Sequence, residues 1–183
     1  MQPFLLRSAA FLGITSLLWV GCKKADNPNN ETEHESINKV ELTFRQGATT
    51  AGVFVVEDAD GDGGNPPSRI DTIRLNPSQA YTVDTKVFTI SAGTTRDITP
   101  TILAQGTVHE FYYLPTGVSL TIAKTDRDAN NFPLGLASTW TSGGAGSGSV
   151  QIKLMHKPLL KGPNDAPTVG HSDIEIAMPV KIQ

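Results

Sequence analysis

The sequence has a single cysteine, Cys22, among its 183 residues. One thiol cannot form a disulfide within the chain, so a folded domain must be stabilised by burying apolar surface. Three common catalytic signatures are also missing: G-x-S-x-G, H-E-x-x-H and a phosphate-binding loop. We therefore expect a protein that is not an enzyme, with a catalytic site assembled from distant loops as a remaining alternative.

Positive charge is scarce as well. The chain has 15 Lys and Arg against 18 Asp and Glu, which gives a formal net charge of −3. Proteins that bind nucleic acid depend on clustered cations that contact phosphates. The charge balance therefore argues against a nucleic-acid partner.

No apolar run is long enough to span a membrane, because residues 9–20 fall well short of the roughly 20 residues that a spanning helix needs. Gly21 and Cys22 directly follow this run. A cysteine directly after a small residue at such a place resembles the lipobox of bacterial lipoproteins, in which the sulfur is lipidated and the chain is cut before the cysteine. We expect residues 1–21 to be a signal peptide and Cys22 to anchor the protein in a membrane. The alternatives are a secreted protein with one spare thiol and an intact hydrophobic N-terminus.

Residues 22–36 predict a flexible tether. After Cys22 the sequence is KKADNPNNETEHES, which has no large apolar residue. A random coil of this length reaches roughly 20 Å. Because Lys23 follows the cysteine, resemblance to the sorting rule of bacterial lipoproteins implies the outer membrane of the cell envelope, with its face undecided.

From residue 37 to residue 183 the pattern predicts one β domain. Apolar residues recur with period two in short runs rich in Val, Ile and Thr, and Gly, Pro and Asn separate the runs. Thr99 as a cap before Pro100 predicts one short helix. We expect nine strands. Eight are at residues 40–44, 52–57, 81–91, 109–113, 118–124, 136–141, 149–156 and 173–182, and the third strand in order ends at residues 73–75.

Nine strands in a domain of this length favour an immunoglobulin-like or Greek-key β-sandwich, with a closed barrel as the alternative. If successive strands are antiparallel, the short connections fall at one end and the long loops at the other. The long loops are residues 58–69, 92–107, 125–134 and 157–170. Sandwiches commonly bind partners through loops gathered at one end, so we expect the functional surface there.

Two segments have oxygen ligands at alternate positions, as the calcium ion requires. In residues 58–64 (DADGDGG) the spacing matches the first half of an EF-hand loop, but Arg69 stands where the bidentate Glu belongs. In residues 126–131 (DRDANN) the match is fainter, and both segments are also ordinary turn sequences. The candidate calcium ligands are Asp58, Asp60, Asp62, Asp126, Asp128 and Asn130.

His109 and His156 predict an alternative site. His109 begins one expected strand and His156 ends another, which places both near the long-loop end. Two imidazoles there, with Glu110 or His171, could bind zinc or copper. The competing interpretation is that they close the core by hydrogen bonding to the backbone.

Aromatic residues give a further candidate surface. Tyr112 alternates with inward-facing residues and is expected to be exposed, whereas Trp140 is expected in the core. An exposed aromatic side chain would suit a glycan, and an envelope protein is the other partner that we consider.

Several stretches together resemble a family of small lipoproteins from Bacteroidota-type bacteria of unassigned activity. They are VELTF (40–44), the 58–64 loop, HEFYY (109–113), TDRDANNFPLG (125–135), His156 and SDIEI (172–176). Members of this family have been labelled as type 1 periplasmic-binding folds, which implies two α/β lobes. The period-two pattern and the length argue against that label here.

These features lead to one expectation with two alternatives. We expect a lipid-anchored, non-enzymatic binding or interaction module of the cell envelope, with calcium as a candidate stabiliser of its Asp-rich loops. The alternatives are a zinc- or copper-binding lipoprotein that uses His109 and His156, and an envelope enzyme with a loop-built site.

Overall fold

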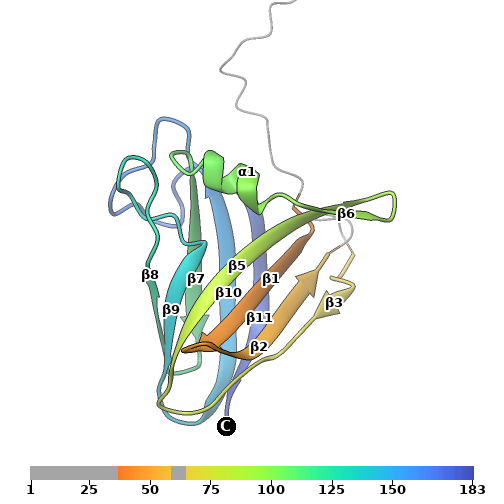
Figure 1. Ribbon diagram of the computed structural model, residues 1–183, viewed down its shortest axis with the longest axis vertical. Coiled ribbons are helices and arrows are strands. Elements are labelled where there is room, and N and C mark those ends of the chain that lie inside the picture. Colours follow the sequence, from red (N-terminus) through yellow and green to blue (C-terminus); the bar gives the residue numbers. More distant parts are fainter. Residues whose placement is uncertain (1–36, 59–64) are drawn as a thin grey trace, which may run out of the picture. The chain divides into compact units, whose positions relative to one another are not determined.

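The computed structural model describes residues 37–58 and 65–183 (Figure 1). No helix in this part of the chain has the length and apolar character that crossing a membrane requires. In chain order the elements are β1 (Lys39–Gln46), β2 (Thr49–Glu57), β3 (Arg69–Ile70), β4 (Ile73–Leu75), β5 (Ala80–Ser91), β6 (Thr94–Asp97), α1 (Thr99–Ala104), β7 (His109–Thr116), β8 (Leu120–Lys124), β9 (Ala137–Ser142), β10 (Gly146–His156) and β11 (His171–Ile182).

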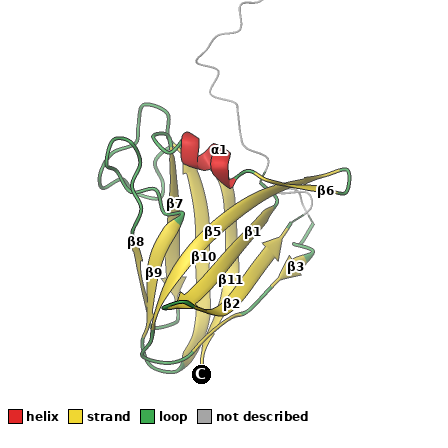
Figure 2. Ribbon diagram, viewed as in Figure 1, coloured by secondary structure: helices red, strands yellow, loops and turns green. Residues whose placement is uncertain are grey.

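The strands form two sheets, so the predicted sandwich is confirmed and the barrel alternative is wrong. The first sheet has the order β3-β2-β1-β5-β9-β8, with β6 paired to β5, and the second has the order β4-β11-β10-β7 (Figure 2). All strand pairs are antiparallel except β4 with β11. The described residues contain eleven strands rather than nine, because the two-residue β3 and the four-residue β6 are too short to show a period. This all-β arrangement is not the pair of α/β lobes that the label of the resembling family implies.

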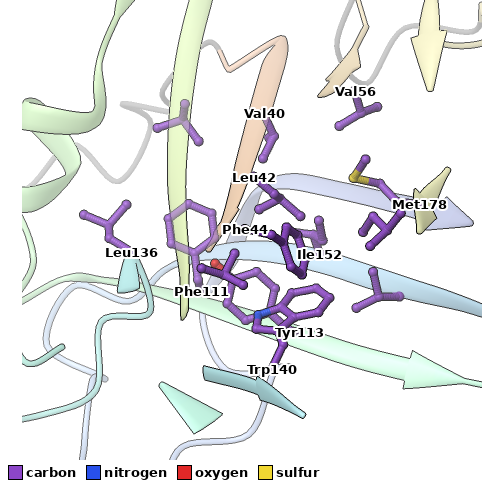
Figure 3. Packing of buried hydrophobic residues seen from close by; sticks show 14 of the residues in the cluster. Val40, Leu42, Phe44, Val56, Phe111, Tyr113, Leu136, Trp140, Ile152 and Met178 are labelled. Carbon is purple, nitrogen blue, oxygen red and sulfur yellow. The ribbon is translucent and has the colours of Figure 1, made fainter. Parts of the chain in front are cut away.

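Both sheets contribute alternate side chains to one core. In β1, Val40, Leu42 and Phe44 are fully buried, as the period-two pattern predicts. The ring of Trp140 in β9 packs edge-on against Phe44, with ring centroids 5.1 Å apart, and against Tyr113 of the second sheet at 5.4 Å. Figure 3 shows these rings between the two sheets. The expected burial of Trp140 is confirmed.

Helix α1 lies across one end of the sandwich (Figure 1). Its Ile102 is fully buried, which docks the helix on the core. The prediction of Thr99 as the cap was wrong by one position, because Ile98 occupies the cap and Thr99 is the first helical residue. The Thr99 hydroxyl instead accepts a hydrogen bond from the Val87 backbone N–H at 3.0 Å, which ties α1 to β5.

The connections separate into two groups, as the antiparallel pattern predicted. We call one group the turn end; it comprises residues 76–79, 117–119 and 142–148. We call the other the loop end; it comprises α1 and residues 104–108, 125–136 and 157–170. Backbone hydrogen bonds join Ser78 to Gly143 at the turn end and Lys157 to Val108 at the loop end. The first described residue, Ile37, belongs to the loop end, because β1 begins beside Val87 of β5, whose carbonyl accepts a hydrogen bond from Ile98 at the start of α1.

Candidate functional site: the loop end

Lys161 joins the three segments of the loop end. Its ammonium group donates to the carbonyl oxygens of Gly106, at 2.6 Å, and of His109, at 2.7 Å. The same group lies 2.8 Å from a carboxylate oxygen of Asp128. Since only 2% of the Lys161 side chain is exposed, this ion pair acts at short range with little screening by water. One lysine therefore fixes the positions of the three loops relative to one another.

A second buried lysine, Lys157, follows directly after β10. Its side chain is fully buried, and its ammonium group lies 3.0 Å from Glu110 Oε2 and 3.5 Å from Asp165 Oδ2. It also donates to the Tyr112 hydroxyl, which in turn donates to Glu110 at 2.7 Å. Lys124 of β8 donates to the other oxygen of Glu110. We call these five residues the Glu110 cluster.

The Glu110 cluster lies on the outer face of the second sheet. In β7, Phe111 and Tyr113 point into the core, so the alternating residues Glu110 and Tyr112 point away from it. Residues 157–170 cover them, and the Asp165 carbonyl oxygen lies 2.9 Å from the Tyr112 hydroxyl oxygen. The cluster is thus enclosed between a sheet face and a loop.

Burial changes the proton affinities in the cluster. It raises the pKa of the Tyr112 hydroxyl, and the hydrogen bond to Glu110 raises it further, so Tyr112 stays protonated. Burial lowers the pKa of Lys124, while the bond to Glu110 opposes that effect. The Lys124 ammonium also lies 3.9 Å from the centroid of the Tyr112 ring, a cation–π distance. The arrangement has the character of a structural ion network with one neutral phenol.

The expectation that Tyr112 is exposed was wrong, because 7% of the residue is exposed. The period-two pattern correctly placed it outside the core. It could not show that residues 157–170 would fold back over that face. Tyr112 therefore offers no surface to a glycan in this structure.

The predicted ligands in the second Asp-rich segment are occupied by the protein itself. The two oxygens of Asp126 accept hydrogen bonds from the backbone N–H groups of Gly135, at 2.7 Å, and Leu136, at 2.9 Å. Asp128 accepts from Asn130 and Phe132 and pairs with Lys161. Burial raises the pKa of Asp128, but Lys161 and the two N–H groups outweigh it, so the net pKa lies below its usual value. These contacts hold a turn, and calcium at Asp126, Asp128 and Asn130 would have to displace them.

The first Asp-rich segment lies mostly outside the described residues. Asp60 and Asp62 are not described, and Asp58 is described at the end of β2, where its N–H donates to the Asn38 carbonyl at 2.8 Å. In the described part of the chain no group of three or more His, Cys, Asp or Glu is placed to hold a metal ion. Calcium at residues 58–64 stays a prediction.

The two candidate histidines meet at the loop end, as expected. The rings of His109 and His156 are stacked, with centroids 4.8 Å apart and planes 14° from parallel. A metal ion binds in the plane of an imidazole ring, and nearly parallel stacked planes share no point close to both rings. One ring would therefore have to turn before both could bind the same zinc or copper ion, and the transition-metal site stays a prediction.

His109 has polar neighbours of its own. Its Nδ1 lies 3.1 Å from the Gln105 carbonyl oxygen, which can only accept, so Nδ1 carries a proton. Its Nε2 lies 3.3 Å from Asp173 Oδ2, and both side chains are almost fully buried. This environment fits the competing interpretation, in which a histidine closes the core by bonding to the backbone.

The loop end also carries the most exposed apolar side chains in the described part of the chain. Leu159 is 102% exposed, Leu103 of α1 is 59% exposed and Leu160 is 55% exposed. Sequence reasoning missed these leucines and also missed Lys157 and Lys161. The available signal was the sequence KPLLK at residues 157–161, where two lysines flank two leucines and only one pair can face inward.

Comparisons with known proteins give no family. No family model matches the chain, and neither curated proteins nor solved structures give a match. The resemblance to small Bacteroidota-type lipoproteins accordingly stays a prediction.

Proposed function

We propose that this protein is a lipid-anchored, non-enzymatic interaction module of the cell envelope, held at the outer membrane through Cys22. The observation that carries the proposal is the bracing of the loop end by buried ion pairs at Lys157 and Lys161. Long loops that are fixed in one arrangement lose little conformational entropy when they meet a partner. Such preorganisation suits a binding surface.

The ionisable groups of the loop end favour binding over catalysis. A general acid or base must be able to reach a substrate and exchange its proton near neutral pH. Glu110 is held by two lysines and a phenol, and Asp128 by a lysine and two backbone N–H groups. These contacts would have to break before either carboxylate could act on a substrate.

The anchor is tested by replacing Cys22 with Ser in the full chain. We expect the unmodified protein to sediment with membranes and to yield an N-terminal peptide whose mass includes the lipid. Cys22→Ser should move the protein to the soluble fraction without changing its melting temperature. A wild-type protein that is soluble and has a free thiol would refute the anchor.

Calcium and transition metals are separated by their effects on the melting temperature, Tm. Calcium bound at Asp58, Asp60 and Asp62 predicts a rise in Tm with calcium that Asp60→Asn abolishes. A site at His109 and His156 predicts a rise with zinc or copper that His156→Ala abolishes. Because His109 Nδ1 is held by a backbone carbonyl, as metal-binding histidines commonly are, the transition-metal site is kept as the second candidate.

A further inference from the structure

In the segment Lys157–Lys161 the charged side chains are buried and the leucine side chains are exposed. The Lys157 side chain is fully buried and that of Lys161 is 2% exposed. Leu159 and Leu160, between them, are 102% and 55% exposed. Folded proteins ordinarily bury leucine and leave lysine in water. The inversion is therefore a feature that needs a physical explanation.

The inversion is unfavourable for the isolated domain. Burying a leucine side chain contributes about 1.5–3 kcal/mol, and burying an ammonium group costs several kcal/mol before its ion pairs offset that cost. Leu159 also has a positive φ of 62°, a backbone region that a leucine adopts only at an energetic cost. The fold thus holds Leu159 fully exposed and Leu160 half exposed, so much of their apolar surface adds nothing to the stability of the domain. An apolar partner outside the domain would supply the missing burial.

The turn that presents these leucines is fixed rather than loose. The backbone N–H groups of Leu160 and Lys161 both donate to the Lys157 carbonyl, at 3.1 and 3.2 Å. The Lys157 N–H donates to Val108 at 2.6 Å, which joins the turn to the end of the α1 connection. The two lysines anchor the turn at its base, so the leucines project from a rigid support.

The exposed surface of this turn carries no charge. Residues 158–164 read PLLKGPN, and the one charged side chain among them, that of Lys161, is directed into the protein. Leu103 of α1 adds a third exposed leucine at the same end. An uncharged, leucine-rich tip suits a hydrocarbon phase better than a polar protein surface.

The start of the domain indicates which hydrocarbon phase is within reach. Ile37 lies at the loop end, 15 residues after Cys22 in the sequence. If the sulfur of Cys22 carries a lipid and residues 22–36 form the flexible tether that the sequence predicts, Ile37 lies within roughly 20 Å of the bilayer. The leucine tip then belongs to the end of the domain that is nearest the membrane.

We infer that Leu159 and Leu160, with Leu103 at the same end of the domain, insert into the interfacial region of the bilayer as a second membrane contact. The inference rests on the proposed lipid anchor and adds an orientation to it. A single lipid chain leaves a domain free to tilt, and a second contact fixes which end faces the membrane. The preorganised loop end would then meet its partners at the membrane surface.

The sequence has one cysteine, so in the lipidated protein an introduced cysteine is the one free thiol and can be labelled selectively. In the full-length lipidated protein, Leu159→Cys introduces one site for a nitroxide label, and Ala145→Cys gives a matched site in the exposed turn at the opposite end. Both proteins are reconstituted in vesicles of phosphatidylethanolamine and phosphatidylglycerol. The exposed Leu159 has no packing to lose, so both variants should fold as the parent does.

The expected result is one label per chain in both variants, with the label at position 159 protected from a water-soluble paramagnetic quencher and that at position 145 fully accessible. Protection should correspond to a depth of about 5–10 Å below the headgroup boundary. Equal accessibility at the two positions would overturn the second contact while leaving the anchor intact, even if a protein partner were later found at the leucines. Two labels per chain would show a free Cys22 and overturn the anchor and the inference together.

Discussion

The two ends of the sandwich are held together by different chemistry. At the turn end the bonds join neutral groups: the Ser142 hydroxyl donates to the Asn76 carbonyl at 2.7 Å, and the Gln79 N–H donates to Ser142 at 3.0 Å. At the loop end the bonds join charges, with Lys157 and Lys161 at the centre. Both ends are compact, but among the described residues the loop end is the one that depends on buried ion pairs.

The difference follows from the length of the connections. Short turns keep their ends close, so backbone groups and a serine hydroxyl reach their partners directly. Residues 157–170 and 125–136 are longer, and only long side chains span the gaps between them. A buried charge is costly once its partner is gone, whereas a neutral hydrogen bond contributes little net free energy. The loop end should therefore be the more sensitive of the two ends to substitution.

The largest effect is expected from Lys157→Met. Methionine keeps much of the length and volume of lysine but leaves Glu110 and Asp165 without their shared cation. We expect the free energy of unfolding to fall by about 3–5 kcal/mol, the usual result of breaking a buried pair. Urea denaturation at neutral pH measures the loss.

The matched control is Lys153→Met, in strand β10, which Lys157 directly follows. Lys153 pairs with Glu175 at 2.8 Å on the surface, where 42% of the Glu175 side chain is exposed. An exposed pair of this kind contributes about 0–1 kcal/mol. Equal losses for the two variants would show that the Glu110 cluster is no more important than a surface ion pair.

Asp128→Asn should produce the next largest effect. The amide oxygen still accepts the turn bonds, but Lys161 loses its counter-charge, so we expect a loss of about 1.5–3 kcal/mol at neutral pH. Because the pKa of Asp128 is lowered from 3.8 in the folded state, its stabilisation is fully present above 3.8 and is lost as the pH falls through the folded pKa. The difference in free energy of unfolding between wild type and variant should therefore become smaller as the pH falls. If the two free energies of unfolding stayed a constant distance apart from pH ~6 to pH ~3, this role of Asp128 would be contradicted.

Much of the fold was predictable from the sequence, because period-two burial is a local signal. The strands around Val40 and Trp140 and the separation of short turns from long loops were confirmed. Strands β3 and β6 were not predicted, because two to four residues carry no period.

The interior of the loop end was not predictable in the same way. Glu110 is 47 residues from Lys157 in the chain, and the two pair only after residues 157–170 fold over the sheet. Asp165 is 8 residues from Lys157 and belongs to the same loop. The single local hint was the sequence of residues 157–161. Turn-forming aspartates at 126 and 128 resembled a calcium loop because backbone N–H groups and calcium both require carboxylate oxygens in a tight turn.

At the turn end, Ser142→Ala should cost about 1 kcal/mol. The substitution removes neutral hydrogen bonds to Asn76 and Gln79 without leaving a buried charge. Ser147→Ala, at an exposed position of the same turn, should change stability by less than about 0.5 kcal/mol. A loss at Ser142 as large as that of Lys157→Met would remove the proposed difference between the two ends.

The smallest effect, and the one of opposite sign, is expected from Leu159→Asn. Asparagine tolerates the left-handed backbone region that Leu159 occupies at a φ of 62°, and the fully exposed leucine has no packing to lose. We expect the free energy of unfolding in water to rise by about 0.5–1 kcal/mol.

In the lipidated protein on vesicles, the same substitution should weaken protection of the loop end from hydrogen exchange. Leu160→Asn, as a control without the positive φ, should weaken that protection without the gain in stability. A loss of stability for Leu159→Asn would mean that the leucine supports the fold, and the inverted pattern of residues 157–161 would no longer require an external apolar partner.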